Sequence, residues 1–344
     1  MATAVLQSPK TAFLPASIDA CAMYRMYLPH LRIPDSLFLF RMERLDLREL
    51  QEYEVIVVQR QVTPQNYMAL KKLKDYGKKL IYDLDDDVWS LPASNPAQQM
   101  FKMVENGFGE CMKWVDVITV STQTLKGVVT AKLPHLKQEV LVTPNAIDFD
   151  LFQPSTLERD DDKVILGWAG SNTHDGDMTE ISSVIPDLLK KYPKLYVEFV
   201  GGAAPKRLRG MDRVTSRPWV PVGEFANRFS SWSWDISMAP LNSIRFNNSK
   251  SNIKMLESAA VGIPCVVSNV RPYYEFCSLG GKELEWLLCD TTRDWKTKLE
   301  KLIEEPAYRK EVAELMYATA RKYFSIDTIA ENWKYAARKA AGRN

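Results

Sequence analysis

The sequence is poor in the residues that bind metals and form disulfides. Its 344 residues include three histidines and five cysteines, and no two cysteines have the C-x-x-C spacing. An odd number of cysteines without that spacing disfavours both a zinc site and a disulfide framework. Reduced thiols are typical of proteins inside cells, so we expect a cytoplasmic protein.

The sequence also lacks long apolar segments and a strong net charge. No run approaches the ~18 consecutive apolar residues of a membrane-spanning helix, and no signal-peptide pattern is expected at the N-terminus. The net charge of +2 gives no general attraction to nucleic acids or membranes. One local basic run, Lys71 to Lys79, is typical of a solvated helix face.

Short β-branched segments alternate with longer helical patterns along the chain. This alternation predicts an α/β protein with parallel sheets covered by helices on both faces. It occurs twice, on either side of an irregular segment at 144–162, which we interpret as a linker between two Rossmann-like domains. The last helical pattern runs over 294–341. The expected strands are 11–16, 36–41, 55–59, 79–84, 117–121 and 140–144, then 164–169, 195–201, 234–241, 264–268 and 286–289.

The segment Phe246–Asn269 predicts a loop, a helix and a buried strand in that order. Lys250 and Lys254 lie four residues apart near the helix start, where like charges repel and the helix dipole disfavours cations. A bound anion would remove both penalties, and Glu257 continues the same stripe. Free backbone amides at a helix start bind phosphate, so we expect a phosphate-bearing ligand, with a solvated lysine face as the alternative.

Three successive carboxylates, Asp85, Asp86 and Asp87, follow the expected strand 79–84. Adjacent carboxylates repel one another unless a metal, a basic group, sugar hydroxyls or helix N-termini offset their charge. Ligands of parallel sheets bind outside the carboxyl ends of the strands, so we expect Asp85 and Asp86 to face a cleft. A capped turn in solvent is the alternative, because aspartate is favoured at N-caps and turns.

A glycine-bounded loop, G-W-A-G-S-N-T-H, begins within the expected strand 164–169 and extends beyond it. Gly170 permits close approach of a ligand to the backbone, and we place Ser171 beside it in the site. His174 is either a ligand contact or an exposed loop residue. Asp177 is expected to cap the helix that follows. The loop does not have the G-x-G-x-x-G spacing, so a dinucleotide fingerprint is not supported.

Cations follow two further expected strands. Lys206 and Arg207 come after the glycine pair that ends the strand 195–201, where they could bind a diphosphate or be ordinary surface residues. Tyr24 and Arg25 follow the first strand. An arginine there could bind an anionic acceptor, and a surface salt bridge is equally consistent with the pattern.

These motifs together resemble the nucleotide-sugar-dependent glycosyltransferases of the GT-B fold, in particular the large retaining group numbered family four. The segment 142–154 is similar to the interdomain pattern P-N-G-I-D … F-x-P, with Ala146 in place of the glycine. Residues 165–174 and 246–264 resemble I-G-W-A-G-S-x-T-H and F-N-x-x-K-S-N-I-K-x-L-E-x-x-A-x-G-x-P, two motifs of a bacterial and phage subgroup.

The resemblance covers nearly the whole chain and implies its organisation. It implies an acceptor-binding Rossmann-like domain at 1–150 and a donor-binding one at 151–322. The remaining residues, 323–344, would form a C-terminal helix that crosses back to the first domain.

The resemblance also implies residue roles. Glu257 matches the carboxylate that binds the donor ribose, and the other glutamate of the family pattern would fall at Ser249, so Lys250 is expected to bind phosphate or sugar instead. Asp85 and Asp86 stand where many relatives carry a histidine. The expected catalytic residues are Asp85, Asp86, His174 and Lys250, and the expected acceptor contacts are Tyr24, Arg25 and Asp87. The expected donor contacts are Gly170, Ser171, Lys206, Arg207, Asn248, Ser249, Lys250, Ser251, Asn252 and Glu257.

The sequence therefore predicts transfer of a sugar from a nucleotide-diphosphate sugar to an acceptor hydroxyl, with retention implied by the resemblance. Fixed cations would stabilise the leaving diphosphate, so no metal or other cofactor is expected, although the aspartate run could hold a divalent ion. A glycan, a lipid-linked saccharide or a hydroxymethylated DNA base would fit as acceptor. The alternatives are a nucleotide-sugar epimerase, against which the few histidines count, and a non-catalytic nucleotide-sugar-binding protein.

Overall fold

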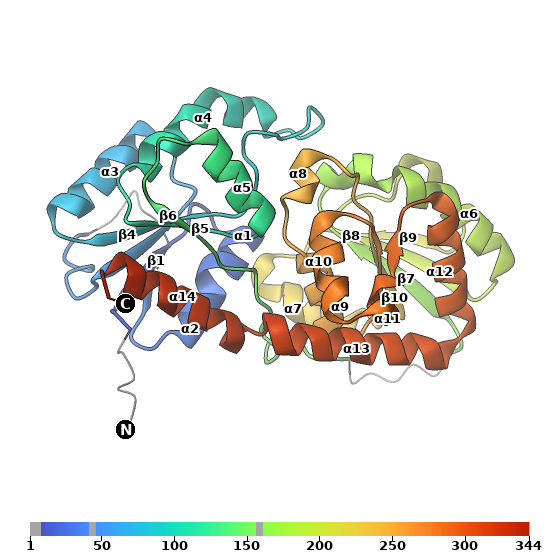
Figure 1. Cartoon of the computed structure of the whole chain (residues 1–344). Coiled ribbons are helices and arrows are strands. Elements are labelled where there is room, and N and C mark those ends of the chain that lie inside the picture. Colours follow the sequence, from blue (N-terminus) through green and yellow to red (C-terminus); the bar gives the residue numbers. More distant parts are fainter. Residues whose placement is uncertain (1–7, 41–45, 156–160, 344) are drawn as a thin grey trace, which may run out of the picture.

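The computed structural model describes residues 8–40, 46–155 and 161–343, which form two parallel α/β units (Figure 1). In the described residues each sheet has six strands, and all neighbouring strands are parallel. The first sheet contains β1 Thr11–Leu14, β2 Leu37–Phe38, β3 Val55–Gln59, β4 Lys79–Leu84, β5 Val117–Val120 and β6 Glu139–Val142. The second contains β7 Val164–Ala169, β8 Leu195–Val200, β9 Val214–Arg217, β10 Ile236–Ala239, β11 Cys265–Ser268 and β12 Leu288–Cys289.

Helices connect the strands and cover both sheets. In the first unit they are α1 Ala20–Ala22, the π-helix η1 Met23–Tyr27, α2 Leu28–Arg32, α3 Pro64–Asp75, α4 Gln98–Met112 and α5 Gln123–Lys132. In the second they are the 3-10 helices η3 Asn172–Met178 and η4 Lys206–Leu208, with α6 Thr179–Lys191, α7 Val222–Ser231, α8 Arg245–Asn248, α9 Ile253–Ala260, α10 Arg271–Leu279, α11 Lys282–Glu285 and α12 Thr292–Glu304. This order confirms the expected pair of Rossmann-like units.

The central strands are buried along their whole length, as expected for parallel sheets covered on both faces. Val55–Gln59 and Cys265–Ser268 have no exposed residue. Their apolar residues are therefore nearly continuous and do not alternate with polar ones.

The order of the strands determines where ligands can enter. The first sheet has the order β2-β1-β3-β4-β5-β6, so its direction of winding reverses between β1 and β3. The second has the order β12-β11-β10-β7-β8-β9 and reverses between β10 and β7. In doubly wound sheets the crevice outside the carboxyl ends of the strands at such a reversal is the usual ligand site.

The last two helices, α13 Pro306–Phe324 and α14 Ile326–Ala340, join the two units (Figure 1). α13 packs on α9 and α12, whereas α14 packs on α2, β4 and β5. Trp333 of α14 is buried against Phe13 of β1, with ring centroids 5.8 Å apart. The expected return of the C-terminal helix to the first unit is thus confirmed. None of the described helices combines the length and apolar character needed to cross a membrane.

Three local expectations were wrong. The strand β9 was missed, because its V-T-S-R sequence is polar and mostly exposed. The helical pattern at 294–341 is three helices, interrupted at Pro306 and at the N-cap Ser325. Asp177 does not cap α6, which begins at Thr179.

The expected linker 144–162 has no regular helix or strand in its described part, and residues 156–160 lie outside the described residues.

Arg25 is the largest charged side chain of the core and is fully buried. Its Nε and Nη2 donate to Asp83 Oδ2 and Oδ1 at 3.0 and 2.6 Å, and its Nη1 donates to the Thr143 carbonyl and to Asn145 Oδ1. Its guanidinium carbon lies 5.1 Å from the centre of the Trp333 ring. Arg25 therefore joins η1, β4, the segment after β6 and α14. This buried position corrects the sequence-based assignment of Arg25 to an acceptor.

Replacing Arg25 with alanine would leave the Asp83 carboxylate buried without its cation. Breaking a buried ion pair at one partner costs about 3–5 kcal/mol, so we expect Arg25→Ala to lower the free energy of unfolding by that amount. Urea denaturation followed by circular dichroism measures it. Arg48→Ala is the control, because the Arg48 side chain is 88% exposed and a surface pair contributes less than about 1 kcal/mol. Equal midpoints for the two variants would contradict the role given to Arg25.

Candidate active site

The carboxyl ends of the two sheets are joined by four side-chain contacts between the units. They link Thr122 Oγ1 to the Ser249 carbonyl (2.9 Å), Asn145 Nδ2 to Ser251 Oγ (2.9 Å), Asp87 Oδ2 to Arg245 Nε (3.2 Å) and Tyr24 Oη to Glu257 Oε1 (2.7 Å). Three of the four contacts end on residues 245–251, which contain the lysine and asparagine motif singled out in the sequence. The motif therefore lies at the boundary between the units.

A pocket lies between the units beside the carboxyl ends of β7 and β8. Its empty volume is about 580 Å³ including space open to solvent, but the cavity proper is about 70 Å³. This is smaller than a typical small-molecule site, so a ligand of that size would need the pocket to open. Its walls are mainly apolar, and its charged groups are Lys254 and Glu257. The lining residues are Ala20, Met23, Tyr24, Phe152, Ala169, Gly170, Val200, Gly201, Trp219, Val220, Val222, Phe225, Ala226, Lys254 and Glu257.

Glu257 provides the acidic group of this pocket. Its side chain is 5% exposed, and its Oε2 accepts a hydrogen bond from Lys254 Nζ at 3.1 Å. Its Oε1 accepts from the Tyr24 hydroxyl. Burial and the Glu257 charge raise the pKa of Tyr24 well above its ordinary value, so the phenol stays protonated and donates. Tyr24 thus links the first unit to the carboxylate that is expected to bind the donor.

Lys250 lies in the turn between α8 and α9, one turn earlier than the helical position expected from the sequence. Its Nζ is 4.8 Å from the centre of the Phe246 ring, and it has no hydrogen bond or ion pair with any described residue. Burial is the main reason that the pKa of Asp86 is raised and that of His174 lowered, and the Lys250 charge lowers both. The Lys250 charge therefore lowers the pKa of both side chains, and its ammonium is available to bind an anion.

His174 forms a pair with Asp177. Its Nδ1 lies 2.9 Å from Asp177 Oδ2, while Asp177 Oδ1 accepts hydrogen bonds from the Asn242 amide and from Asn247 Nδ2. A carboxylate can only accept, so Nδ1 carries the proton. Since burial and Lys250 lower the pKa of His174, the ring is neutral at pH 7 and Nε2 carries a lone pair.

The polar residues around Lys250 mostly shape the turn. Asn248 Oδ1 accepts from the Arg271 amide at 3.0 Å, and Ser249 Oγ donates to the Arg245 carbonyl. Asn252 is the N-cap of α9 but makes no side-chain hydrogen bond to the helix. The first amides of α9 have no acceptor within the helix, so they can bind an anion at the boundary between the units.

Of the remaining residues expected to contact the donor, one lines the pocket and three do not. Gly170 lines the pocket, and a Cβ there would lie 2.5 Å from the Trp168 ring, so the position requires glycine. Ser171 Oγ is within 2.6 Å of Thr173 Oγ1 at an exposed position. Lys206 and Arg207 are exposed on η4 and do not line the pocket. The structure thus does not bring these two cations to the candidate site.

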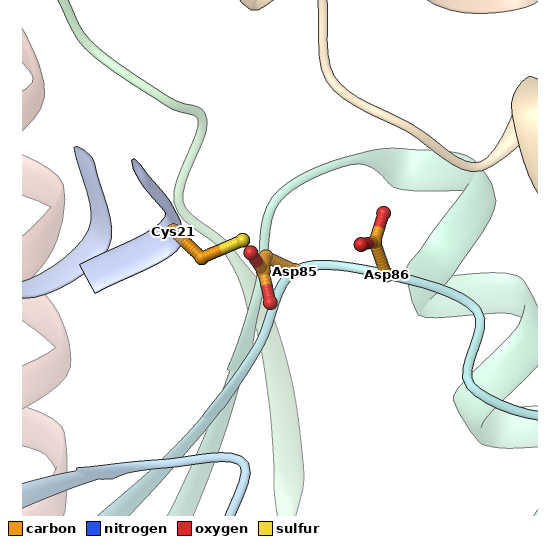
Figure 2. A group of neighbouring side chains, drawn as sticks. All are labelled: Cys21, Asp85 and Asp86. Atoms are coloured by element: carbon orange, nitrogen blue, oxygen red, sulfur yellow. The ribbon is translucent and has the colours of Figure 1, made fainter. Parts of the chain in front are cut away.

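A second cluster follows β1 and β4, where Cys21 lies beside Asp85 and Asp86 (Figure 2). Asp85 is 7% exposed, and its Oδ1 lies 3.6 Å from Arg60 Nε. Burial and the Asp85 charge raise the pKa of Asp86, and the same two causes raise the pKa of the Cys21 thiol well above its usual range. Asp85 and Asp86 therefore lie at the carboxyl end of the sheet, as expected.

Asp87 points away from this cluster and is fully buried. Its Oδ2 accepts from Ser90 Oγ and Arg245 Nε, and its Oδ1 accepts from the Trp89 amide. With these partners Asp87 holds the turn and contacts the second unit. This corrects its assignment to the acceptor.

A larger open pocket lies at the reversal between β1 and β3. Its empty volume is about 1450 Å³, including space open to solvent. It lies where the strand order places a ligand site in the first sheet. The lining residues are Pro15, Ala16, Ser17, Ile18, Asp19, Phe40, Arg60, Gln61, Val62, Thr63, Asn66, Met100 and Phe101.

Sequence reasoning missed three residues of the site. Arg60 follows β3 with a φ of +46°, but a single arginine after a strand carries no motif. Trp219 lines the pocket and is 59% exposed, but no motif in the sequence singles it out. Arg245 precedes the recognised motif by one residue. The strand-end rule applied to β3 would have found Arg60.

Comparison with known proteins adds one sequence match. The family model described as glycosyl transferase-like matches residues 184–334, which include α9 and the pocket residues Lys254 and Glu257. Among curated proteins none matches the sequence.

Solved structures match over nearly the whole chain. The sucrose-phosphate synthase of Thermosynechococcus elongatus has a TM-score of 0.66 at 13% identity, over 97% of this chain and 99% of that one. Anabaena Alr3699/HepE in complex with UDP has a TM-score of 0.62 at 12% identity, over 94% and 97%. A putative UDP-N-acetylglucosamine 2-epimerase from Listeria monocytogenes has a TM-score of 0.56 at 13% identity, over 94% of both chains. The chain has the GT-B fold, and residues 184–334 match the glycosyl transferase-like model.

Proposed function

We propose that this protein is a glycosyltransferase that transfers a sugar from a nucleotide-diphosphate sugar to an acceptor hydroxyl. The observation that carries the proposal is the Lys250 ammonium, unpaired among the described residues, in the turn before α9, the helix that contributes Lys254 and Glu257 to the pocket. A cation and free amides bind phosphate, and a buried carboxylate binds ribose hydroxyls.

The pocket suits the nucleoside half of such a donor. Glu257 Oε1 accepts a hydrogen bond from the Tyr24 hydroxyl in the structure. With donor bound, ribose hydroxyls would replace Tyr24 and donate to Glu257. Trp219 at the pocket wall offers an aromatic face to the base. The match to a structure containing UDP, Anabaena Alr3699/HepE, makes UDP the first nucleotide to test.

Fixed charges supply the electrostatic stabilisation that the reaction needs. Negative charge develops on the diphosphate as the sugar leaves, and Lys250 with the α9 amides would offset it without a metal. His174 would face the sugar as a neutral imidazole, held by Asp177. The acceptor would enter from the first unit, through the pocket at the β1–β3 reversal, and meet the sugar near Asp86.

We propose retention of the anomeric configuration. The resemblance to the retaining group supports it, and so does the site composition: the only carboxylate lining the donor pocket, among the described residues, is Glu257, which is held by Tyr24 and Lys254. No carboxylate is thus free there as a base on the opposite face. The departing phosphate would take the acceptor proton on the same face.

One alternative has a specific observation in its favour, and another has lost the observation that supported it. The match to a putative epimerase keeps open a reaction that consumes donor without an acceptor. Glycosylation of DNA has lost its support from the basic run: Lys74 pairs with Asp116, Lys78 donates to three backbone carbonyls, and Lys71 lies over Trp114. These three lysines are engaged in the fold.

A thermal-shift panel of nucleoside diphosphates tests the donor site. We expect one diphosphate family to raise the melting temperature, with about 2.7 kcal/mol added at 100 times its Kd, and the shift to persist in EDTA. Loss of the shift in EDTA would show that a metal carries the diphosphate. No shift with any nucleotide would contradict the proposal.

Lys250→Ala should weaken UDP binding by about 10- to 100-fold, because it removes a charge-assisted hydrogen bond to phosphate. Isothermal titration calorimetry measures the Kd. Lys310→Ala is the control, because its side chain is 80% exposed on α13. The same Kd in both variants would remove Lys250 from the donor site.

Asp86→Asn should slow transfer while leaving UDP affinity within about twofold, because Asp86 faces the acceptor side. Release of UDP from a nucleotide sugar, with water as acceptor, gives the rate. We expect a loss of about 100-fold, because Asp86 would orient the attacking oxygen without taking its proton. Asp212→Asn, at a position with a 95% exposed side chain, is the control. A matching loss of UDP affinity would place Asp86 at the donor instead.

A further inference from the structure

The cluster of Cys21, Asp85 and Asp86 brings a thiol and two carboxylates together from distant parts of the sequence. One ligand atom from each side chain lies within 4.8 Å of the others. Figure 2 shows the Cys21 sulfur pointing at the Asp85 carboxylate, with Asp86 next along the turn after β4. Sulfur and carboxylate oxygen are both common ligands of divalent metals of intermediate softness.

The Asp85 carboxylate provides an independent indication of a ligand. Asp85 has an exposed fraction of 7%, so it is more than nine-tenths buried. Its Oδ1 accepts no hydrogen bond from the described residues. Its contact with Arg60 Nε is an ion pair at 3.6 Å, too long for a hydrogen bond. Arg60 instead lies closer to Asp19, at 3.2 Å. A buried carboxylate oxygen without a donor requires an explanation, and a cation at this point supplies one.

The charges around the cluster favour the same occupant. Asp85, Asp86 and a Cys21 thiolate carry three negative charges, and the positive charge of Arg60 is shared with Asp19 at 3.2 Å. A divalent cation would offset most of the negative charge of the three ligands. The Lys250 charge also acts on Asp86, and in the proposed function Lys250 binds the diphosphate.

We propose that Cys21, Asp85 and Asp86 form a binding site for a divalent metal ion of the zinc class. Binding converts Cys21 from thiol to thiolate, so one proton is released to solvent as the metal–sulfur bond forms. A purely hard ion such as Mg²⁺ would use the carboxylates alone, and the sulfur ligand distinguishes the zinc class from it.

The geometry needs only small side-chain movements. Tetrahedral zinc with sulfur at about 2.3 Å and oxygen at about 2.1 Å separates its ligand atoms by about 3.5 Å. The three side chains therefore need to converge by about 1 Å. Three protein ligands leave a fourth position, which a water molecule or an acceptor hydroxyl would occupy. Arg60 remains beside Asp85 and orients it.

The metal site does not depend on the proposed transferase activity. The donor diphosphate has its own cation in Lys250, so nucleotide binding and metal binding are separate measurements. If the activity proposal is correct, a metal here would bind the acceptor oxygen and lower its pKa, a role distinct from stabilising the leaving diphosphate.

Titration of the full-length reduced protein with Co²⁺ tests the site directly. Thiolate-bound Co²⁺ absorbs in the near ultraviolet, whereas Co²⁺ bound by carboxylates alone does not give this band. We expect the band to saturate at one equivalent and to disappear when Zn²⁺ is added. Absence of the band in the folded protein would overturn the proposal.

Variants identify the ligands. Cys21→Ser should abolish the band, while Asp85→Asn and Asp86→Asn should each weaken Co²⁺ binding by more than about tenfold. Cys277→Ala, a buried cysteine on α10 outside the cluster, is the control and should keep it. A band that survives in Cys21→Ser, or is unchanged in both aspartate variants, would contradict the site. Circular dichroism of each variant separates loss of ligand from loss of fold, and Cys21→Ala replaces Cys21→Ser if the serine variant does not fold.

Discussion

The structure depends on one buried cation. Arg25 is surrounded by partners from three segments, and its hydrogen bond to Asn145 connects the core to the boundary between the units, because Asn145 donates in turn to Ser251. Asp83, the ionic partner of Arg25, also accepts a hydrogen bond from Thr119 at its Oδ1. Asp83 is the last residue but one of β4, the strand that Asp85 and Asp86 follow. The same ion pair thus holds the C-terminal helix through Trp333 and positions both sides of the site.

The candidate site divides its charges between the two units. The second unit offers the unpaired Lys250 and the held carboxylate Glu257, which suit phosphate and ribose. The first unit offers Asp85 and Asp86, buried beside a thiol, which suit a hydroxyl or a cation. The Tyr24–Glu257 hydrogen bond joins the two units at the pocket, so the proposed donor would require this contact to open. Closed units exclude water, which would otherwise hydrolyse the donor.

Sequence patterns predicted the fold well because they report burial. The continuous apolar strands indicated two parallel sheets, and the motif around Lys250 indicated where to look for a candidate site. They could not show that Arg25 is in the core, because its partners Asp83 and Asn145 are 58 and 120 residues away. Arg60 was also missed, because its ionic partners Asp19 and Asp85 are likewise distant in the sequence. Short-range signals also failed where the chain is polar, as in β9, or where a cap interrupts a continuous helical pattern, as at Ser325.

Hydrogen–deuterium exchange with and without UDP tests the central claim most directly, because it reports where the nucleotide binds without assuming a sugar or an acceptor. The account predicts protection of the amides at 169–171 and 248–254, with faster exchange in 20–27 as the Tyr24 contact opens. Protection confined to the β1–β3 pocket at 15–19 and 60–66, or no change anywhere in the chain, would contradict a donor site between the two units.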